Sequence, residues 1–86
     1  MDFYTQAELD FHDRGVLYPG EIEILVDQFI AECIETNKHE VLVITGKGKV
    51  VKPVVKQYLG KNKFVESFKQ ASYYNGGEGA FEVVLK

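Results

Sequence analysis

The chain has 86 residues, 45% of them hydrophobic and 27% charged, and this balance predicts one soluble globular domain over residues 1–86 and argues against disorder. A single cysteine excludes an internal disulfide, and no apolar run approaches the roughly 20 residues of a membrane-spanning helix. The N-terminus has no signal-peptide pattern, so we expect an intracellular, cytoplasmic domain that makes no membrane contact and is monomeric.

The formal net charge of -3 hides a strong segregation of charge along the chain. Residues 1–40 contain ten acids and two bases, whereas residues 41–65 contain six lysines and no acid. A local charge of +6 can bind a polyanion even though the whole chain is acidic. The alternative is a solvated lysine face with no ligand.

The first half of the chain predicts a strand, a helix and a second strand. Residues 9–12 alternate apolar and polar side chains, which is typical of a strand covered on one face. A helix should begin near Pro19, because an apolar stripe at helical spacing follows and proline suits the first helical position. The continuous apolar run of residues 41–45 indicates a buried strand.

The second half predicts a shorter helix and two further strands. The helix carries Val51, Val55 and Leu59 on its apolar face and should stop at Gly60. Residues 64–71 and 80–85 are predicted strands, joined by a glycine-rich turn over residues 75–79 that needs positive φ angles. The order β-α-β-α-β-β with right-handed crossovers gives an α/β (α+β) two-layer sandwich, with both helices on one face of the sheet.

Two polar features should meet in this architecture. If Leu9 and Phe11 face the helices, Asp10 and His12 point to the open face near the carboxyl end of their strand. The loop TGKG, residues 45–48, also follows the carboxyl end of a strand, where open α/β sheets bind ligands.

The loop is neither a Walker A motif nor a dinucleotide fingerprint, because the glycine spacing of both is absent. Its two glycines allow the backbone amides of residues 46–49 to approach an anion, and Lys47 and Lys49 add charge. A tight turn without a ligand is the alternative. His12 is similarly open to two interpretations, a general acid/base oriented by Asp10 or a surface histidine at a strand end. Tyr73 and Tyr74 could stack on bases, pack in the protein or simply face solvent.

Three motifs in one order, LDFH at residues 9–12, TGKG at 45–48 and NGGEGAFEVVL at 75–85, resemble the small MutS-related (Smr) domain family. The resemblance covers a core of about residues 8–86. It implies a mixed four-stranded sheet with two helices on one face, similar to the C-terminal domain of translation initiation factor three. It also implies nucleic-acid binding and, in several members, endonuclease activity on structured DNA or RNA.

The resemblance also implies roles for individual residues. Asp10 and His12 become the catalytic pair, and a divalent metal, Mg²⁺ or Mn²⁺, at Asp10 stays open. The nucleic-acid-binding residues come from the loop, the basic helix and the glycine turn: Thr45, Gly46, Lys47, Gly48, Lys49, Lys52, Lys56, Gly76, Gly77 and Gly79. The chain departs from the family at Asp13, where many members have glycine, and at Thr45, where many have histidine.

Three hypotheses for the function therefore follow. The first is a nucleic-acid-binding domain that hydrolyses phosphodiester bonds in structured DNA or RNA. The second is a non-catalytic module, often part of a larger protein, that binds nucleic acid or the ribosome. A protein-interaction domain that docks through its acidic first helix is a third hypothesis.

Overall fold

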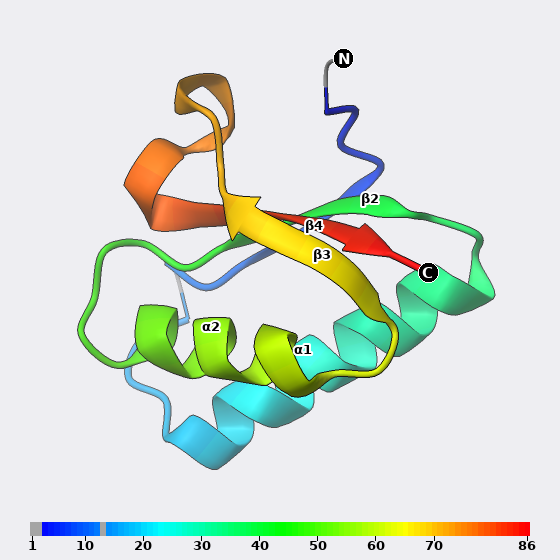
Figure 1. The fold of residues 1–86 in the computed structure, drawn as a ribbon. Coiled ribbons are helices and arrows are strands. Elements are labelled where there is room, and N and C mark those ends of the chain that lie inside the picture. Colours follow the sequence, from blue (N-terminus) through cyan, green and yellow to red (C-terminus); the bar gives the residue numbers. More distant parts are fainter. Residues whose placement is uncertain (1–2, 13) are drawn as a thin grey trace.

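A computed structural model, which describes residues 3–12 and 14–86, has a four-stranded sheet with two helices packed against it (Figure 1). The elements follow the predicted order β-α-β-α-β-β, and the predicted fold class is confirmed. Their bounds are β1 Ala7–Asp10, α1 Pro19–Glu35, β2 Glu40–Ile44, α2 Val51–Lys61, β3 Val65–Gln70 and β4 Ala80–Leu85.

The sheet is mixed, with the strand order β1-β2-β4-β3. β1 pairs with β2 in parallel, and Asp10 lies opposite Ile44. β4 lies between β2 and β3 and runs antiparallel to both. The carboxyl ends of β1, β2 and β3 and the beginning of β4 therefore lie at one edge of the sheet, which we call the loop edge.

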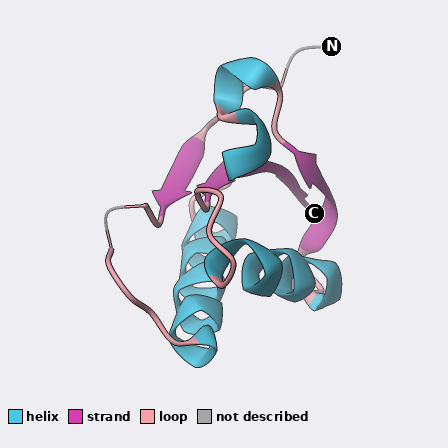
Figure 2. Cartoon of the chain, turned by 90° about the vertical axis from the view of Figure 1, so that its left-hand side faces the viewer, coloured by secondary structure: helices cyan, strands magenta, loops and turns pink. Residues whose placement is uncertain are grey.

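Both helices cover the same face of the sheet (Figure 2). The core-facing residues of α1 recur at helical spacing, and all are at most 3% exposed: Ile22, Val26, Ile30 and Cys33. They pack against alternate residues of the strands, including Val41 and Val43 of β2 and Phe81, Val83 and Leu85 of β4. The period-2 pattern of the strands therefore decides which side chains enter this core.

Local sequence explains the ends of α1. Pro19 occupies the first helical position, and the carboxylate of Glu21 accepts a hydrogen bond of 2.9 Å from the backbone N–H of Tyr18. The helix ends at Glu35, Asn37 two residues later adopts the left-handed conformation at φ 59°, and the N–H of Lys38 donates to the Cys33 carbonyl at 2.8 Å. Neither α1 nor α2, the helices of the described part of the chain, is both long and apolar enough to cross a membrane.

Several predicted boundaries were wrong by one or two residues: β1 begins at Ala7, β2 spans Glu40–Ile44 and β3 spans Val65–Gln70, and the ends of α2 and β1 also differ. α2 continues through Gly60 to Lys61, because Gly60 keeps a negative φ and the N–H of Asn62 caps the Tyr58 carbonyl. β1 ends at Asp10 rather than His12, although the N–H of Phe11 still donates to the Ile44 carbonyl at 2.8 Å. His12 consequently lies just beyond the strand.

The face of the sheet away from the helices is partly covered. The chain between β3 and β4 rises over it as two short 3-10 turns, Tyr73–Asn75 and Gly77–Gly79, and we call residues 72–79 the glycine turn (Figure 1). A small second cluster, Leu42, Ala71 and Ala80, is buried beneath it. The glycine turn therefore lies on the face opposite the helices, at the loop edge.

Candidate functional site

The topology brings the three sequence motifs together at the loop edge. Asp10 ends β1, Thr45 follows β2, and Gly79 precedes β4, and these three strands are neighbours in the sheet. The backbones are joined directly, because the N–H groups of Thr45 and Gly46 both donate to the carbonyl of Gly79, at 2.8 and 2.9 Å. Motifs separated by more than 30 residues in the sequence thus form one continuous site.

Asp10 and His12 form a hydrogen-bonded pair at the end of β1. The Nδ1 atom of His12 lies 2.6 Å from Oδ1 of Asp10, and the backbone N–H of His12 donates to the same oxygen at 2.9 Å. The side chain of His12 is 58% exposed and that of Asp10 is 36% exposed, so a ligand can reach the pair. As predicted, Leu9 and Phe11 point into the core while Asp10 and His12 do not.

The electrostatics of the pair favour an ionised Asp10. The backbone N–H of His12, together with its imidazole, holds the pKa of the Asp10 carboxyl below its ordinary value of 3.8. A carboxylate that accepts from Nδ1 fixes the tautomer of the neutral imidazole, with the proton on Nδ1. This geometry suits an imidazole that transfers protons through Nε2.

Sequence reasoning missed a third residue at this end of β1. The Nε atom of Arg14 donates to the Asp10 carbonyl at 3.3 Å, and its guanidinium lies 6.0 Å from the centroid of the Phe11 ring. Arg14 thereby packs against the end of β1. Asp13, where the family pattern has glycine, lies outside the described residues.

The loop after β2 is shaped by one glycine. Gly46 has φ +71°, in the left-handed region, whereas Gly48 has an ordinary φ. A Cβ atom on Gly79 would lie 3.5 Å from the Cα atom of Gly46, an ordinary van der Waals separation, so the two backbones are neighbours. Because the Gly46 amide donates to Gly79, the prediction that it faces an anion is wrong for this one amide.

Thr45, for which the resemblance implies a histidine in many members, is 4% exposed. Its hydroxyl lies 2.7 Å from the carbonyl oxygen of Gly46 and 3.3 Å from that of Gly79. The hydroxyl therefore points into the loop and ties it to the glycine turn.

The predicted binding lysines extend from the loop onto α2. Lys47, Lys49 and Lys56 are exposed and Lys52 is half-buried, and none of the four forms an ion pair with a described residue. Lys52 and Lys56 lie one helical turn apart and share a face of α2. Farther along, Lys61 pairs with Glu23 of α1 at 3.7 Å. The four lysines predicted to bind nucleic acid therefore carry charge that no described residue pairs, in the loop after β2 and on α2.

The glycine turn is anchored by a residue that sequence reasoning also missed, Glu82 of β4. Its carboxylate is 3% exposed and accepts hydrogen bonds from the N–H of Ser72 at 2.8 Å and from the Asn75 side chain at 3.1 Å. Burial alone would raise the pKa of Glu82, but these hydrogen bonds outweigh it and lower the pKa below 4.5. The sequence signal that could have identified Glu82 is its position as the one acid within the apolar run AFEVVL.

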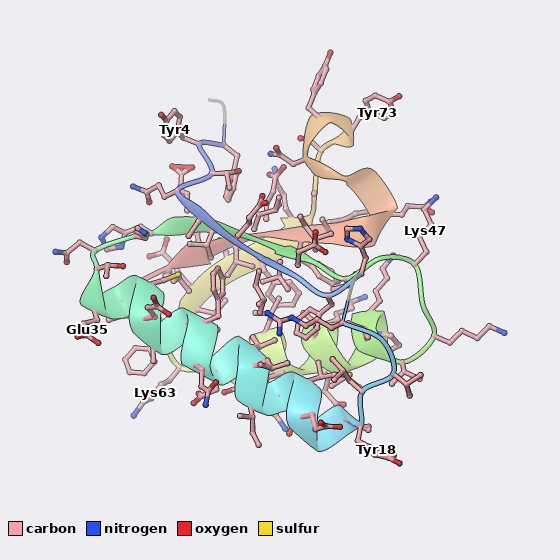
Figure 3. The ribbon with its side chains drawn as sticks, turned by 180° about the vertical axis from the view of Figure 1, so that it is seen from behind. Tyr4, Tyr18, Glu35, Lys47, Lys63 and Tyr73 are labelled. Atoms are coloured by element: carbon pink, nitrogen blue, oxygen red, sulfur yellow. The ribbon has the colours of Figure 1, made fainter. Side chains whose placement is uncertain are left out.

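The turn adopts the predicted positive φ angles at Gly76, +109°, and Gly77, +54°, but not at Gly79. Gly76 and Gly77 line a hollow of about 450 Å³ together with Lys47, Gln70, Ala71, Tyr73 and Glu78. Figure 3 shows Lys47 and Tyr73 projecting on the same side of the molecule. The hollow joins the loop after β2 to the turn before β4.

The donor set at the loop edge is small for a metal centre. The described residues contain no group of three or more His, Cys, Asp or Glu side chains that could hold an ion. Asp10 and His12 supply two candidate ligands, and Oδ1 of Asp10 already accepts both hydrogen bonds from His12. A Mg²⁺ or Mn²⁺ ion here would need water and substrate oxygens to complete its shell.

Comparison with known proteins decides the family. The family model for the Smr domain matches residues 9–86. The chain belongs to the Smr domain family. Curated relatives of this Smr domain include proteins named endonuclease MutS2 from Streptococcus sanguinis, 39% identical over 82 residues, and from Streptococcus gordonii, 38% identical over 82 residues. The matches cover 94% of the Smr domain described here but only 10% of each relative, so it spans about a tenth of their length.

Solved structures agree with this assignment. The Smr domain of Thermus thermophilus MutS2 superposes with a TM-score of 0.83 at 28% identity, covering 93% of this chain and 98% of that one. YdaL, a stand-alone small MutS-related protein from Escherichia coli, gives a TM-score of 0.82 at 26% identity, covering 99% of this chain and 68% of that one. The expected family and fold are therefore confirmed.

Proposed function

We propose that this Smr domain binds nucleic acid at the loop edge and hydrolyses a phosphodiester bond there. The observation that carries the proposal is the 2.6 Å contact between His12 and Asp10, beside a glycine loop flanked by lysines that form no ion pair with a described residue. The name endonuclease MutS2, borne by the Streptococcus relatives, supports the same reaction class.

The loop edge contains the groups that such a reaction needs. Hydrolysis requires an activated water, stabilisation of charge on the phosphoryl oxygens and a proton for the leaving oxygen. We assign proton transfer to Nε2 of His12 and the orientation of the imidazole to Asp10. Lys47, together with the loop amides beyond Gly46, would stabilise the phosphoryl charge.

Thr45 has a supporting role in this proposal. Its hydroxyl lies against two loop carbonyls, so it holds the loop to the glycine turn and does not share proton transfer. Asp10 is the residue that would hold Mg²⁺ or Mn²⁺, and the ion would supply further charge stabilisation at the phosphate.

A cleavage assay tests the proposal. The domain is incubated with duplex DNA, branched DNA and structured RNA, each with Mg²⁺, Mn²⁺ or EDTA, alongside His12→Ala. We expect cleavage of at least one substrate by the parent domain and loss of that cleavage in the variant. Cleavage that persists unchanged in a folded His12→Ala protein would remove His12 from the mechanism.

A second candidate function is nucleic-acid or ribosome binding without catalysis. It is favoured by Thr45, which is buried and stands where many family members have a histidine. The motifs at the loop edge therefore contain one imidazole, that of His12, for proton transfer. Under this candidate no substrate is cleaved, yet binding persists in His12→Ala and weakens steeply with salt.

A further inference from the structure

We infer that Tyr73 and Tyr74 form a base-stacking subsite, so that the domain engages nucleic acid through unpaired nucleotides at the glycine turn. This inference rests on the proposed nucleic-acid binding and specifies its substrate class. The rings are 90% and 94% exposed, and they meet edge to face with centroids 5.9 Å apart and an interplanar angle of 83°. Exposed aromatic faces of this kind stack on bases of any sequence.

The backbone beneath the two rings is held firmly. The N–H groups of Asn75 and Gly77 both donate to the Ser72 carbonyl, at 2.9 and 3.0 Å. The Glu82 carboxylate accepts from Ser72 and Asn75 from below. Because the turn is fixed, stacking a base on either ring restricts the side-chain torsions but does not also have to order the backbone.

The charges around Tyr73 suit a base better than a phosphate. The hollow that Tyr73 lines contains one lysine, Lys47, and one acid, Glu78, so its formal charge is balanced. The amide of Gln70 adds a donor and an acceptor. An uncharged base with polar edges fits this surface beside Tyr73, while Lys47 at its border and the next loop lysine, Lys49, attract the adjoining backbone phosphates.

Tyr74 faces a second hollow, of about 850 Å³, on the sheet face opposite the helices. Phe3, Ser67 and Lys69 also line this hollow. The tyrosine pair therefore stands between two hollows, one beside Lys47 and one across the sheet. A single strand could pass from one to the other with a base stacked at the boundary, and a duplex could not, because its bases are stacked on each other inside the helix.

The subsite also lies close to the proposed chemistry. Asp10 pairs with Ile44, and Ile44 pairs with Ala80, which directly follows the glycine turn. Two strand spacings of about 4.8 Å place these backbones roughly 10 Å apart. A stacked base would thus fix a strand within a few nucleotides of His12.

The test compares ligands that differ in their bases while keeping their phosphates. Fluorescence anisotropy is measured with a labelled single strand, a duplex of equal length and an abasic strand of equal length. The variants are Tyr73→Ala/Tyr74→Ala and Tyr73→Phe/Tyr74→Phe. The matched control is Tyr4→Ala/Tyr18→Ala, two tyrosines that are 77% and 75% exposed elsewhere on the molecule (Figure 3).

We expect the alanine pair to weaken single-strand binding by about tenfold and to leave duplex and abasic binding unchanged. The phenylalanine pair and the control should bind as the parent does. Equal weakening on the abasic strand, or no weakening at all, would overturn the stacking subsite while leaving nucleic-acid binding intact. Failure of the parent domain to bind any of the three ligands at low salt would overturn the proposed function and the subsite together.

Discussion

Glu82 should stabilise the domain through the glycine turn, and its replacement gives a quantitative prediction. In Glu82→Ala the Ser72 N–H and the Asn75 amide both lose their acceptor beneath the turn. Hydrogen bonds to a charged group contribute about 1.5–3 kcal/mol each, and the two are not additive because both use the same carboxylate oxygen. We expect a loss of about 3 kcal/mol, out of a total stability of roughly 4–13 kcal/mol for a chain of this length.

Glu82→Gln separates the contribution of the charge from that of the hydrogen bonds. Its side-chain carbonyl can still accept from both donors, so we expect a loss of only about 1 kcal/mol. The folded state holds the pKa of Glu82 below its ordinary 4.5, so the charge stabilises the fold above that pH. The difference between the parent and Glu82→Gln should therefore be constant near neutrality and vanish as the pH falls through the lowered pKa.

Urea denaturation followed by circular dichroism measures both effects, with Glu66→Gln on exposed β3 as the control for removing a strand carboxylate. The control should change the free energy of unfolding by less than about 0.5 kcal/mol. If Glu82→Ala lost no more than the control, or if Glu82→Gln and Glu82→Ala were equally unstable, the anchoring role of the carboxylate would be wrong.

Three further predictions concern the loop, the lysines and the core thiol. Gly46→Ala should lower the free energy of unfolding by about 1 kcal/mol in urea denaturation, because alanine is strained at φ +71°. Gly48→Ala should be neutral or slightly stabilising, and equal losses in the two variants would contradict the backbone conformations described for these glycines. Replacing the three lysines of residues 47, 49 and 52 with glutamine should flatten the plot of log affinity against log salt by about 2–3 units, and an unchanged slope would exclude the loop from binding. Burial raises the pKa of the 3% exposed Cys33 thiol, so a thiol reagent at pH 8 should label it only in denaturant, and rapid labelling of the native protein would be inconsistent with this burial.

Much of the fold could be predicted because its signals are local. The stripe of α1 and the alternation of β4 each identify their own core face, and β4 has the predicted bounds Ala80–Leu85. The insertion of β4 between β2 and β3 is a pairing of distant segments, which no local pattern encodes. The boundary errors, such as those at Gly60 and His12, arose because the local sequence does not distinguish the last residue of an element from the first residue after it.

The candidate site also contains residues that local sequence patterns predict and residues that they do not. Asp10 was placed correctly relative to the sheet because strand periodicity fixes its side, and His12, just beyond the strand, also lies outside the core as expected. The role of Glu82 could not be predicted because it accepts hydrogen bonds from the separate segment of Ser72 and Asn75, and that of Arg14 because its bond to the Asp10 carbonyl depends on the backbone at the end of β1. The binding and catalytic roles of the predicted residues remain predictions that the experiments above address.

The central claim is that His12 transfers a proton in phosphodiester hydrolysis at the loop edge. Its most direct test is single-turnover cleavage by His12→Ala compared with His39→Ala, which replaces the chain's other histidine at the opposite end of β2. Circular dichroism and anisotropy would first establish that both variants fold and bind as the parent does. We predict that His12→Ala loses cleavage by at least about 100-fold while His39→Ala retains it. Equal cleavage by the two variants would contradict the account.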